Sequence, residues 1–240
     1  MGIDYNAKTE KNLLFSTIAH DLRGPFNGFL GLTKIMVEQL PGLTMNDVQK
    51  IAVSMRSSAT NLFRLLENLL QWARLEQGLT PYNPKVFKLR PVTNESIVLV
   101  LEQAKNKGIG ITCTVSEDTE VFADINMLQT IMRNLVSNAM KFTSGGGTIN
   151  LSAKATDDKS VEISVQDSGI GMSSVLLDNL FRINGQTNRR GTADEVSTGL
   201  GLIICKKMIE KLAGQILVES EEGKGSNFRL IIPGNSPPPR

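Results

Sequence analysis

Hydrophobic positions in the first third of the chain recur with the spacing of long helices. Two sets of positions between residues 44 and 78 repeat every seven residues: Val48, Met55, Leu62 and Leu69, and Ile51, Ser58, Leu65 and Trp72. Such a double repeat is typical of a coiled-coil seam. An earlier helix ending near Pro41-Gly42 is predicted by a stripe of Leu14, Ile18, Leu22, Phe26 and Phe29. Two antiparallel helices cannot bury both apolar faces alone, so we expect two copies to form a four-helix bundle.

After about residue 85 the pattern changes to short alternating strands and single amphipathic helices. Strands are predicted near 109–115, 121–123, 148–155, 160–166, 215–220 and 226–232. Helices are predicted from Pro91 to about Lys107, from the capping residue Asp124 toward Gly145, and over 199–212. We therefore expect a helical domain over 8–79, a linker over 80–84, an α/β domain over 85–233 and a disordered tail over 234–240.

Composition narrows the function classes only a little. The net charge of +2 gives no strongly basic field, so nothing argues for nucleic acid as a partner. Cys113 and Cys205 stand far apart without metal-ligand spacing, as expected of reduced structural thiols in the cytoplasm. No apolar run reaches the roughly 20 residues that span a bilayer. We expect a soluble chain with no membrane segment, which can still be a piece of a longer membrane protein.

His20 is the only histidine of the chain, and at helical spacing it lies off the apolar stripe. One alternative is an ordinary core histidine, but such a residue would lie on the apolar stripe. The other alternative is a solvent-facing histidine without a role. Its neighbours weaken that second alternative. Asp21 can orient or deprotonate the imidazole ring, and Pro25 removes a helical hydrogen bond just beyond it.

Asn134 and Asn138 lie one turn apart on the helix predicted after Asp124, with Lys141 on nearly the same face. Asparagine is unfavourable inside a helix, so an aligned pair favours ligand contacts over a merely solvated face. Amide oxygens suit Mg²⁺, which holds few protein ligands and keeps waters and substrate phosphates. Lys141 offers a point charge for phosphate oxygens.

Glycines mark two further candidate sites. In Asp167-Ser-Gly169-Ile-Gly171 the carboxylate can accept a hydrogen bond from the exocyclic amine of adenine, and the glycines let the backbone approach a flat base. A plain Asp-x-Gly turn is the alternative. The stretch 197–202 opens a helix whose free N–H groups can face phosphate. Between these stretches, 182–198 is a candidate lid or a loosely ordered surface loop, and it can be both, because lids are usually mobile when empty.

In this order and spacing, the stretches resemble the motif boxes of sensor histidine kinases. His20-Asp21-Leu22-Arg23-Gly24-Pro25 is similar to the phospho-acceptor box of the dimerisation domain. Four other boxes have counterparts: the asparagine box at 132–143, Asp167-x-Gly169-x-Gly171, Leu180-Phe181-Arg182, and Thr198-Gly199-Leu200-Gly201-Leu202. The same ATP-binding domain occurs in type II topoisomerases, MutL-type repair proteins and certain chaperones. The histidine box singles out the kinases.

The resemblance implies a helical hairpin that forms a dimeric four-helix bundle, followed by an α/β sandwich ATP-binding domain of the gyrase, chaperone, histidine kinase and MutL type. It also implies that ATP phosphorylates His20, which passes the phosphoryl group to an aspartate of a response-regulator receiver domain. Asp21 would accept the proton, and Asn138, supported by Asn134, would hold Mg²⁺. The implied ATP-binding residues are Asn134, Asn138, Lys141, Asp167, Gly169, Gly171, Phe181, Arg182, Thr198, Gly199, Leu200 and Gly201, with Arg189 or Arg190 behind Arg182.

Two other functions stay open at this point. One is an ATPase that transfers nothing to histidine, and the heptad hairpin that carries His20-Asp21 argues against it. The other is a dimeric scaffold without catalysis, and the intact Asn138, Asp167 and glycine pairs argue against that. As a kinase, the chain is expected to be a homodimer and the cytoplasmic part of a larger, membrane-anchored sensor, with no nucleic-acid partner.

Overall fold

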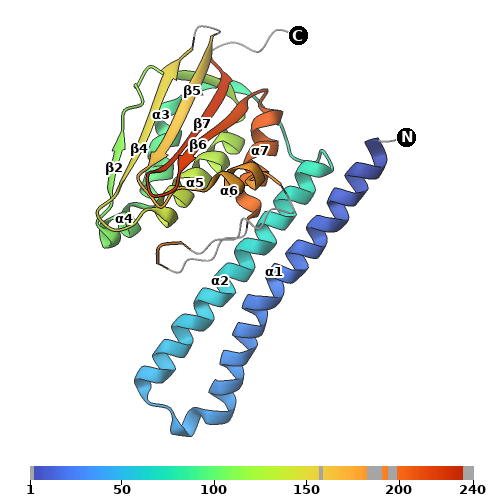
Figure 1. Cartoon of the computed structure of the whole chain (residues 1–240), viewed down its shortest axis with the longest axis vertical. Helices are drawn as coiled ribbons and strands as arrows, with labels where there is room; N and C mark the ends of the chain where they lie inside the picture. The colour runs from blue at the N-terminus through green and yellow to red at the C-terminus, as the bar shows by residue number, and fades with distance from the viewer. Residues whose placement is uncertain (1–2, 157–158, 183–190, 194–198, 235–240) are drawn as a thin grey trace. The chain divides into compact units, whose positions relative to one another are not determined.

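The computed structural model describes residues 3–156, 159–182, 191–193 and 199–234. Within the first helix, the side chains of residues 3–15, 17, 18, 20 and 21 are outside the described part. The chain divides into two compact units, residues 1–74 and 75–240 (Figure 1). The two are taken separately below. The finer domain bounds expected from the sequence stay a prediction.

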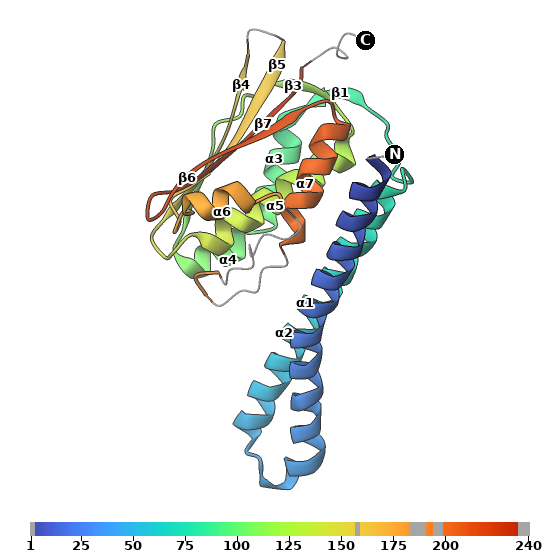
Figure 2. The ribbon, with the colours of Figure 1, turned by 45° about the vertical axis from the view of Figure 1, so that its right-hand side comes forward.

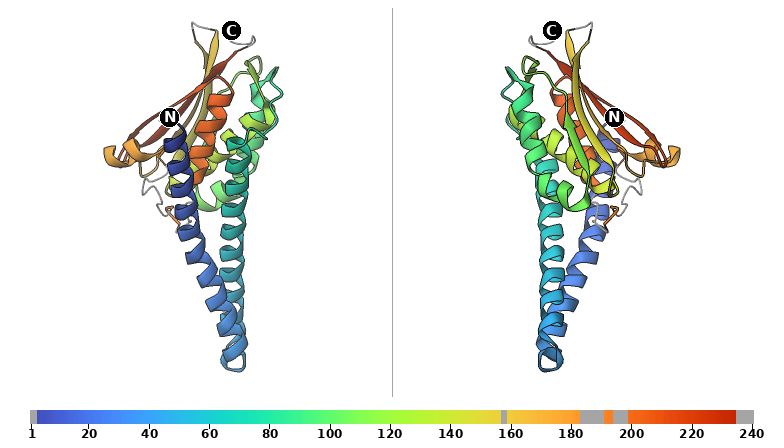
Figure 3. Two further views of the ribbon diagram at one scale, coloured as in Figure 1. Left: turned by 90° about the vertical axis from the view of Figure 1, so that its right-hand side faces the viewer. Right: turned by 90° about the vertical axis from the view of Figure 1, so that its left-hand side faces the viewer.

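The first unit is a helical hairpin. Helix α1 (Ile3–Gln39) continues through Pro25 and is joined by the 3-10 turn η1 (Leu40–Gly42) to α2 (Met45–Glu76), and the two run side by side in Figures 1–3. The start of α2 is capped reciprocally: the Asp47 amide donates to Thr44 Oγ1 at 3.2 Å, and the Thr44 amide donates to Asp47 Oδ2 at 3.1 Å. All eight heptad positions predicted for α2 are buried or half-buried. The predicted seam is confirmed.

The second unit contains the remaining elements in mixed order. Its strands are β1 (Lys85–Lys88), β2 (Gly110–Cys113), β3 (Glu120–Ala123), β4 (Thr148–Ala155), β5 (Ser160–Asp167), β6 (Gln215–Glu221) and β7 (Gly225–Pro233). Its helices are α3 (Leu89–Val98), α4 (Leu101–Lys107), α5 (Ile125–Phe142), α6 (Ser174–Asn179) and α7 (Leu200–Lys211). The α/β class expected from the sequence is therefore correct.

A five-stranded mixed sheet in the order β2-β4-β5-β7-β6 forms one layer of this unit. Only the β2–β4 pair is parallel, and β1 and β3 make a separate antiparallel ribbon. Figures 2 and 3 show α3, α5 and α7 on one face of the large sheet. The core between the layers comes from alternate strand residues, among them Ile149, Leu151, Ile163, Val165, Phe228 and Leu230, and from the inner face of α5. This sandwich fixes α5 beside the end of β5.

Two details differ from the sequence prediction. The single helix expected from Pro91 to Lys107 is broken into α3 and α4. The run from Ile97 to Leu101 is entirely apolar and cannot all face one core. The break buries Val100 and leaves Val98, Leu99 and Leu101 exposed. Helix α6 was not predicted, because six residues are too few to show helical periodicity.

Candidate functional site

Helix α5 presents the predicted asparagine pair. Asp124 caps its start by accepting from the amides of Asn126 at 3.0 Å and Met127 at 3.1 Å. The cap fixes the helix phase, so that Leu128, Ile131, Met132, Leu135 and Ala139 face the core, as predicted. Asn134 and Asn138 then lie half-buried on an adjoining face, where side-chain amides remain within reach of a ligand.

Asn134 is also part of the contact between α5 and α7. Its Nδ2 donates to the Thr130 carbonyl at 3.1 Å. Its Oδ1 lies 3.1 Å from the point that a Cβ on Gly201 would occupy. Burial raises the pKa of the Cys205 thiol to about 12, against a smaller opposite effect of a hydrogen bond with Asn134. The missing side chain of Gly201 therefore lets the start of α7 pack close to α5.

Lys141 ends the face that carries the asparagines. Only 9% of the residue is exposed, and its Nζ lies 5.2 Å from the centroid of the Phe142 ring. A cation over an aromatic face is stabilised while it remains largely out of water. A phosphate group that met this ammonium would do so in a partly desolvated setting, where charge attraction is stronger than in water.

Asp167 ends β5 and is 6% exposed. Its Oδ1 accepts from the amides of Gly169 at 2.8 Å and Ser226 at 3.3 Å. Desolvation raises the pKa of this carboxyl group, and the two backbone hydrogen bonds lower it by less. Both of these bonds end on the same oxygen, so Oδ2 is left as the acceptor for a ligand donor. Sequence reasoning missed the Ser226 amide, because only the β5–β7 register brings it to Asp167.

The glycines after Asp167 have a packing reason that the sequence did not show. A Cβ on Gly169 would lie 2.3 Å from the Phe142 carbonyl oxygen, and one on Gly171 would lie 1.9 Å from that of Glu221. Gly171 also has φ +62°, a conformation that L side chains rarely adopt. Both glycines are therefore required by close packing of this loop against the end of α5 and the β6–β7 turn. The predicted approach of their backbone to a base stays a prediction.

The segment between α6 and α7 is described only in part. Phe181 is half-buried, and the Lys206 Nζ lies 5.7 Å from the centroid of its ring. Arg182 is exposed. Gly199 has φ +65° and precedes the buried Leu200, the first residue of α7. Thr198, Arg189 and Arg190, and with them most of the predicted lid, lie outside the described residues.

The phospho-acceptor motif belongs to the other unit. His20 and Asp21 lie within α1, and their side chains are outside the described part. Of the stripe expected beside them, Leu22 and Phe29 are half-buried, whereas Phe26 is 53% exposed. Of the predicted site residues, Asn134 and Gly201 meet where α5 and α7 approach, and Gly169 packs at the end of α5, whereas His20 belongs to the first unit.

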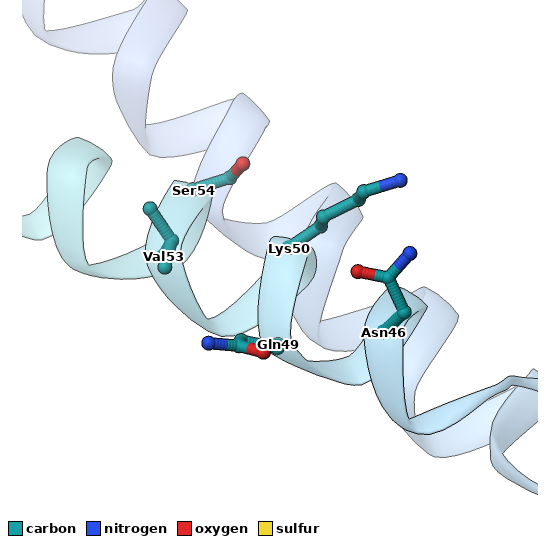
Figure 4. A pocket seen from close by; sticks show the side chains of 5 residues that line it. All are labelled: Asn46, Gln49, Lys50, Val53 and Ser54. Atoms are coloured by element: carbon teal, nitrogen blue, oxygen red, sulfur yellow. The ribbon is translucent and has the colours of Figure 1, made fainter.

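An open groove of about 420 Å³ lies on the first unit. Figure 4 shows its lining side chains along the first turns of α2: Asn46, Gln49, Lys50, Val53 and Ser54. None of the predicted site residues lines this groove. In the described part of the chain, no helix is both long and apolar enough to cross a membrane.

Two family models match the chain. That of the His Kinase A (phospho-acceptor) domain matches residues 10–78, and that of the histidine kinase-, DNA gyrase B- and HSP90-like ATPase matches residues 123–236. His20 falls in the first match, and the predicted nucleotide residues from Asn134 to Gly201 fall in the second. The chain belongs to the sensor histidine kinases.

One sequence relative and two solved structures illustrate what this histidine kinase is similar to. Sensor histidine kinase RcsC of Escherichia coli K12 is 32% identical over 230 residues, which make up 95% of this chain and 24% of that protein. The chain thus spans about a quarter of that relative. Full-length ShkA in complex with AMPPNP superposes with a TM-score of 0.65 at 27% identity, covering 94% of this chain and 46% of that one. ThkA in complex with the response regulator TrrA superposes with a TM-score of 0.71 at 23% identity, covering 92% of this chain and 61% of that one.

The donor set fits a nucleotide with its magnesium ion. Asn138 supplies an amide oxygen, Lys141 a buried cation and Asp167 a buried acceptor. Among the described residues no three His, Cys, Asp or Glu side chains form a cluster that could hold a metal. A Mg²⁺ ion that takes one or two protein oxygens and completes its shell with phosphates and waters needs no such cluster.

Proposed function

We propose that this chain is a histidine autokinase that transfers the γ-phosphoryl group of ATP to His20. The observation that supports it most directly is the presence in one chain of a phospho-acceptor domain, carrying the only histidine, and an ATPase domain with an intact donor set. Neither domain alone distinguishes a kinase from an ATPase. Together they provide both an acceptor and a donor site.

The phosphoryl donor is held by groups of the second unit. Asp167 Oδ2 accepts from the exocyclic amine of adenine, and Lys141 faces the phosphate oxygens. Asn138 would hold Mg²⁺, with Asn134 in support, and the ion would neutralise phosphate charge. Arg182 is exposed and has the reach of a long side chain, which suits the γ-phosphate. The backbone at Gly199 and Leu200 opens α7, whose first amides and positive dipole end favour phosphate.

Transfer needs a neutral imidazole, because only a ring nitrogen with its lone pair can attack phosphorus. The new N–P bond forms as the bond to the leaving oxygen breaks, and ADP departs with that electron pair. Asp21 accepts the proton from the ring. Positioning and charge neutralisation supply most of the rate in such transfers. A second transfer then moves the phosphoryl group from His20 to an aspartate of a receiver domain, consistent with the complex of the similar kinase ThkA with TrrA.

The hairpin is proposed to be a homodimer. Large apolar side chains remain exposed along α1 at Phe26, Leu30 and Val37, and along α2 at Phe63, Leu66 and Leu70. Their spacing places each set on one side of its helix. Exposed apolar stripes on two neighbouring helices are what a second copy of the hairpin would cover in a four-helix bundle. Because the reaction consumes ATP, we place the chain in the cytoplasm.

Incubation with γ-labelled ATP separates this proposal from the two alternatives. We expect label on the protein that is lost in acid and kept in alkali, as phosphohistidine requires. Released phosphate without protein label would mean an ATPase. Neither label nor release, with nucleotide still bound, would mean a scaffold. Addition of receiver domains one at a time should then remove the label with a single cognate partner.

A further inference from the structure

The C-terminal end of α5 is closed by donors from three other segments. A helix leaves its last carbonyls without helical partners, and in α5 these include Met140, Lys141 and Phe142. The Ala139 carbonyl before them accepts the last helical hydrogen bond, from the Thr143 amide at 3.0 Å, and a second one from Thr143 Oγ1 at 2.7 Å. The Phe142 carbonyl accepts from the Ile170 amide at 3.1 Å, which ties the first glycine loop to the helix. The other two carbonyls receive donors that sequence reasoning missed.

Thr192 supplies the donors for Lys141. Its amide donates to the Lys141 carbonyl at 3.0 Å. Its Oγ1 lies 3.2 Å from the same carbonyl and 3.0 Å from that of Thr143. A hydroxyl has one proton, so it donates to one of the two carbonyls at a time. Thr192 lies between α6 and α7 in the sequence, and these bonds fasten Thr192 itself to the helix that presents Lys141.

Lys107 supplies the donor for Met140 and also holds Thr192. Its Nζ lies 3.2 Å from the Met140 carbonyl and 3.1 Å from Thr192 Oγ1. An ammonium group near the last carbonyls of a helix is favoured by the negative end of the helix dipole. The Thr192 hydroxyl therefore accepts from Lys107 and donates to a carbonyl at the end of α5. Lys107 and Thr192 thus act on the end of this helix together.

The position of Lys107 is itself fixed by backbone contacts. It is the last residue of α4, and Gly108 ends that helix with φ +67°. The Gly146 amide donates to the Gly108 carbonyl at 3.2 Å. A Cβ on Gly145 would lie 2.9 Å from the Lys107 carbonyl oxygen. The turn after α5 thus holds the end of α4 in place, and Lys107 reaches Met140 from a rigid base.

We propose that Thr192 and Lys107 are positioning residues for nucleotide binding, which hold the end of α5 through the hydrogen bonds of Thr192 and Lys107 and so fix the backbone of Lys141. The role rests on the proposed use of Lys141 toward ATP phosphates. Neither residue touches the reacting atoms, so their loss weakens binding of ATP in the ground state and transition state alike. Such a loss raises KM and leaves kcat nearly unchanged. Lys107 lies outside the ATPase match at 123–236, so the proposal gives a residue of α4 a role in positioning Lys141.

The test compares Thr192→Val, which removes the hydroxyl, with Thr192→Ser, which keeps it. Lys107→Met is compared with Lys105→Met, which changes an exposed lysine of the same helix. A fluorescent ADP analogue gives the dissociation constant, and autophosphorylation gives KM for ATP and kcat. Loss of one hydrogen bond predicts roughly three- to tenfold weaker binding and higher KM in Thr192→Val and in Lys107→Met. Thr192→Ser and Lys105→Met should stay within about twofold of the wild type, on the same hydrogen-bond reasoning.

Because the two residues share one hydroxyl, the double variant should lose less than the product of the two single losses. The proposal is overturned if Thr192→Val and Lys107→Met bind like the wild type, if Thr192→Ser is as weak as Thr192→Val, or if kcat falls while KM stays constant. Circular dichroism confirms that each variant is folded, and Lys107→Met carries the test if Thr192→Val is not. A wild type that binds no nucleotide contradicts the proposed function instead.

Discussion

Replacement of Asp167 by asparagine separates nucleotide recognition from folding. The substitution keeps an oxygen that can accept from the amides of Gly169 and Ser226. It replaces the second carboxylate oxygen with an NH₂ donor, and an adenine amine in front of it would meet a donor in place of an acceptor. A hydrogen bond to a charged group contributes about 1.5–3 kcal/mol. Its loss predicts nucleotide binding that is roughly 10- to 150-fold weaker, at about 1.4 kcal/mol per factor of ten.

Although Asp167→Asn should weaken nucleotide binding, it should not lower the stability of the fold. Burial raises the pKa of Asp167, so its carboxyl group binds a proton more readily in the folded chain than in the unfolded one. A group with a raised pKa stabilises the fold at low pH, and that contribution is lost as the pH rises through the folded pKa. At pH 7 the ionised Asp167 is therefore a cost to folding, which asparagine removes. We expect the free energy of unfolding of Asp167→Asn to be equal to or above that of the wild type at pH 7, with the difference shrinking as the pH falls.

The assay is titration with ATP and with GTP, which has a carbonyl where adenine has its amine, together with denaturant unfolding at pH 7. Asp178→Asn, an exposed substitution on α6, serves as the matched control. The wild type should prefer ATP, and Asp167→Asn should lose most of that preference. Undiminished ATP affinity and preference in Asp167→Asn, with the control unchanged, would refute the assignment. A large loss of stability at pH 7 would refute the account of the buried charge.

Two further substitutions test the magnesium ligand and the dimer. Asn138→Ala should weaken Mg²⁺-ATP binding and stop autophosphorylation. The control Ser137→Ala, at the exposed neighbouring position, should do neither. Normal turnover of Asn138→Ala at low Mg²⁺ would show that the Asn138 amide only faces solvent. Leu62→Asp places an unpaired charge in the seam, so it should lower the free energy of unfolding by at least about 2 kcal/mol or dissociate the dimer in sedimentation. The control Ser57→Asp, on the exposed side of the helix, should do neither. An intact dimer of Leu62→Asp would refute the heptad register.

The parts of the fold that follow from local periodicity could be predicted from the sequence. The heptads of α2 and the apolar face of α5 repeat often enough to fix both the helix and its buried side. Asp124 as the cap of α5 follows from local hydrogen-bond chemistry, which needs no tertiary contact. Asp167 could be singled out because a carboxylate directly after an apolar strand stands at the edge of a sheet.

Features set by contacts between distant segments could not be predicted. Gly169 and Gly171 were noticed, but their close approach to the carbonyls of Phe142 and Glu221 could not be predicted, because only the packed domain brings these groups near. Lys107 and Thr192 are 85 residues apart and gave no pattern that links them. The break between α3 and α4 likewise depends on which side chains of an apolar run find space in the core.

The most direct test of the central claim is the site of phosphate on the protein after incubation with γ-labelled ATP. The account predicts acid-labile phosphate on His20, found by fragmentation of peptides kept at alkaline pH. It also predicts complete loss of label in His20→Gln, which should bind nucleotide as the wild type does. Label at the wild-type level in His20→Gln would contradict the account. So would phosphate on a residue other than His20 in the wild-type protein.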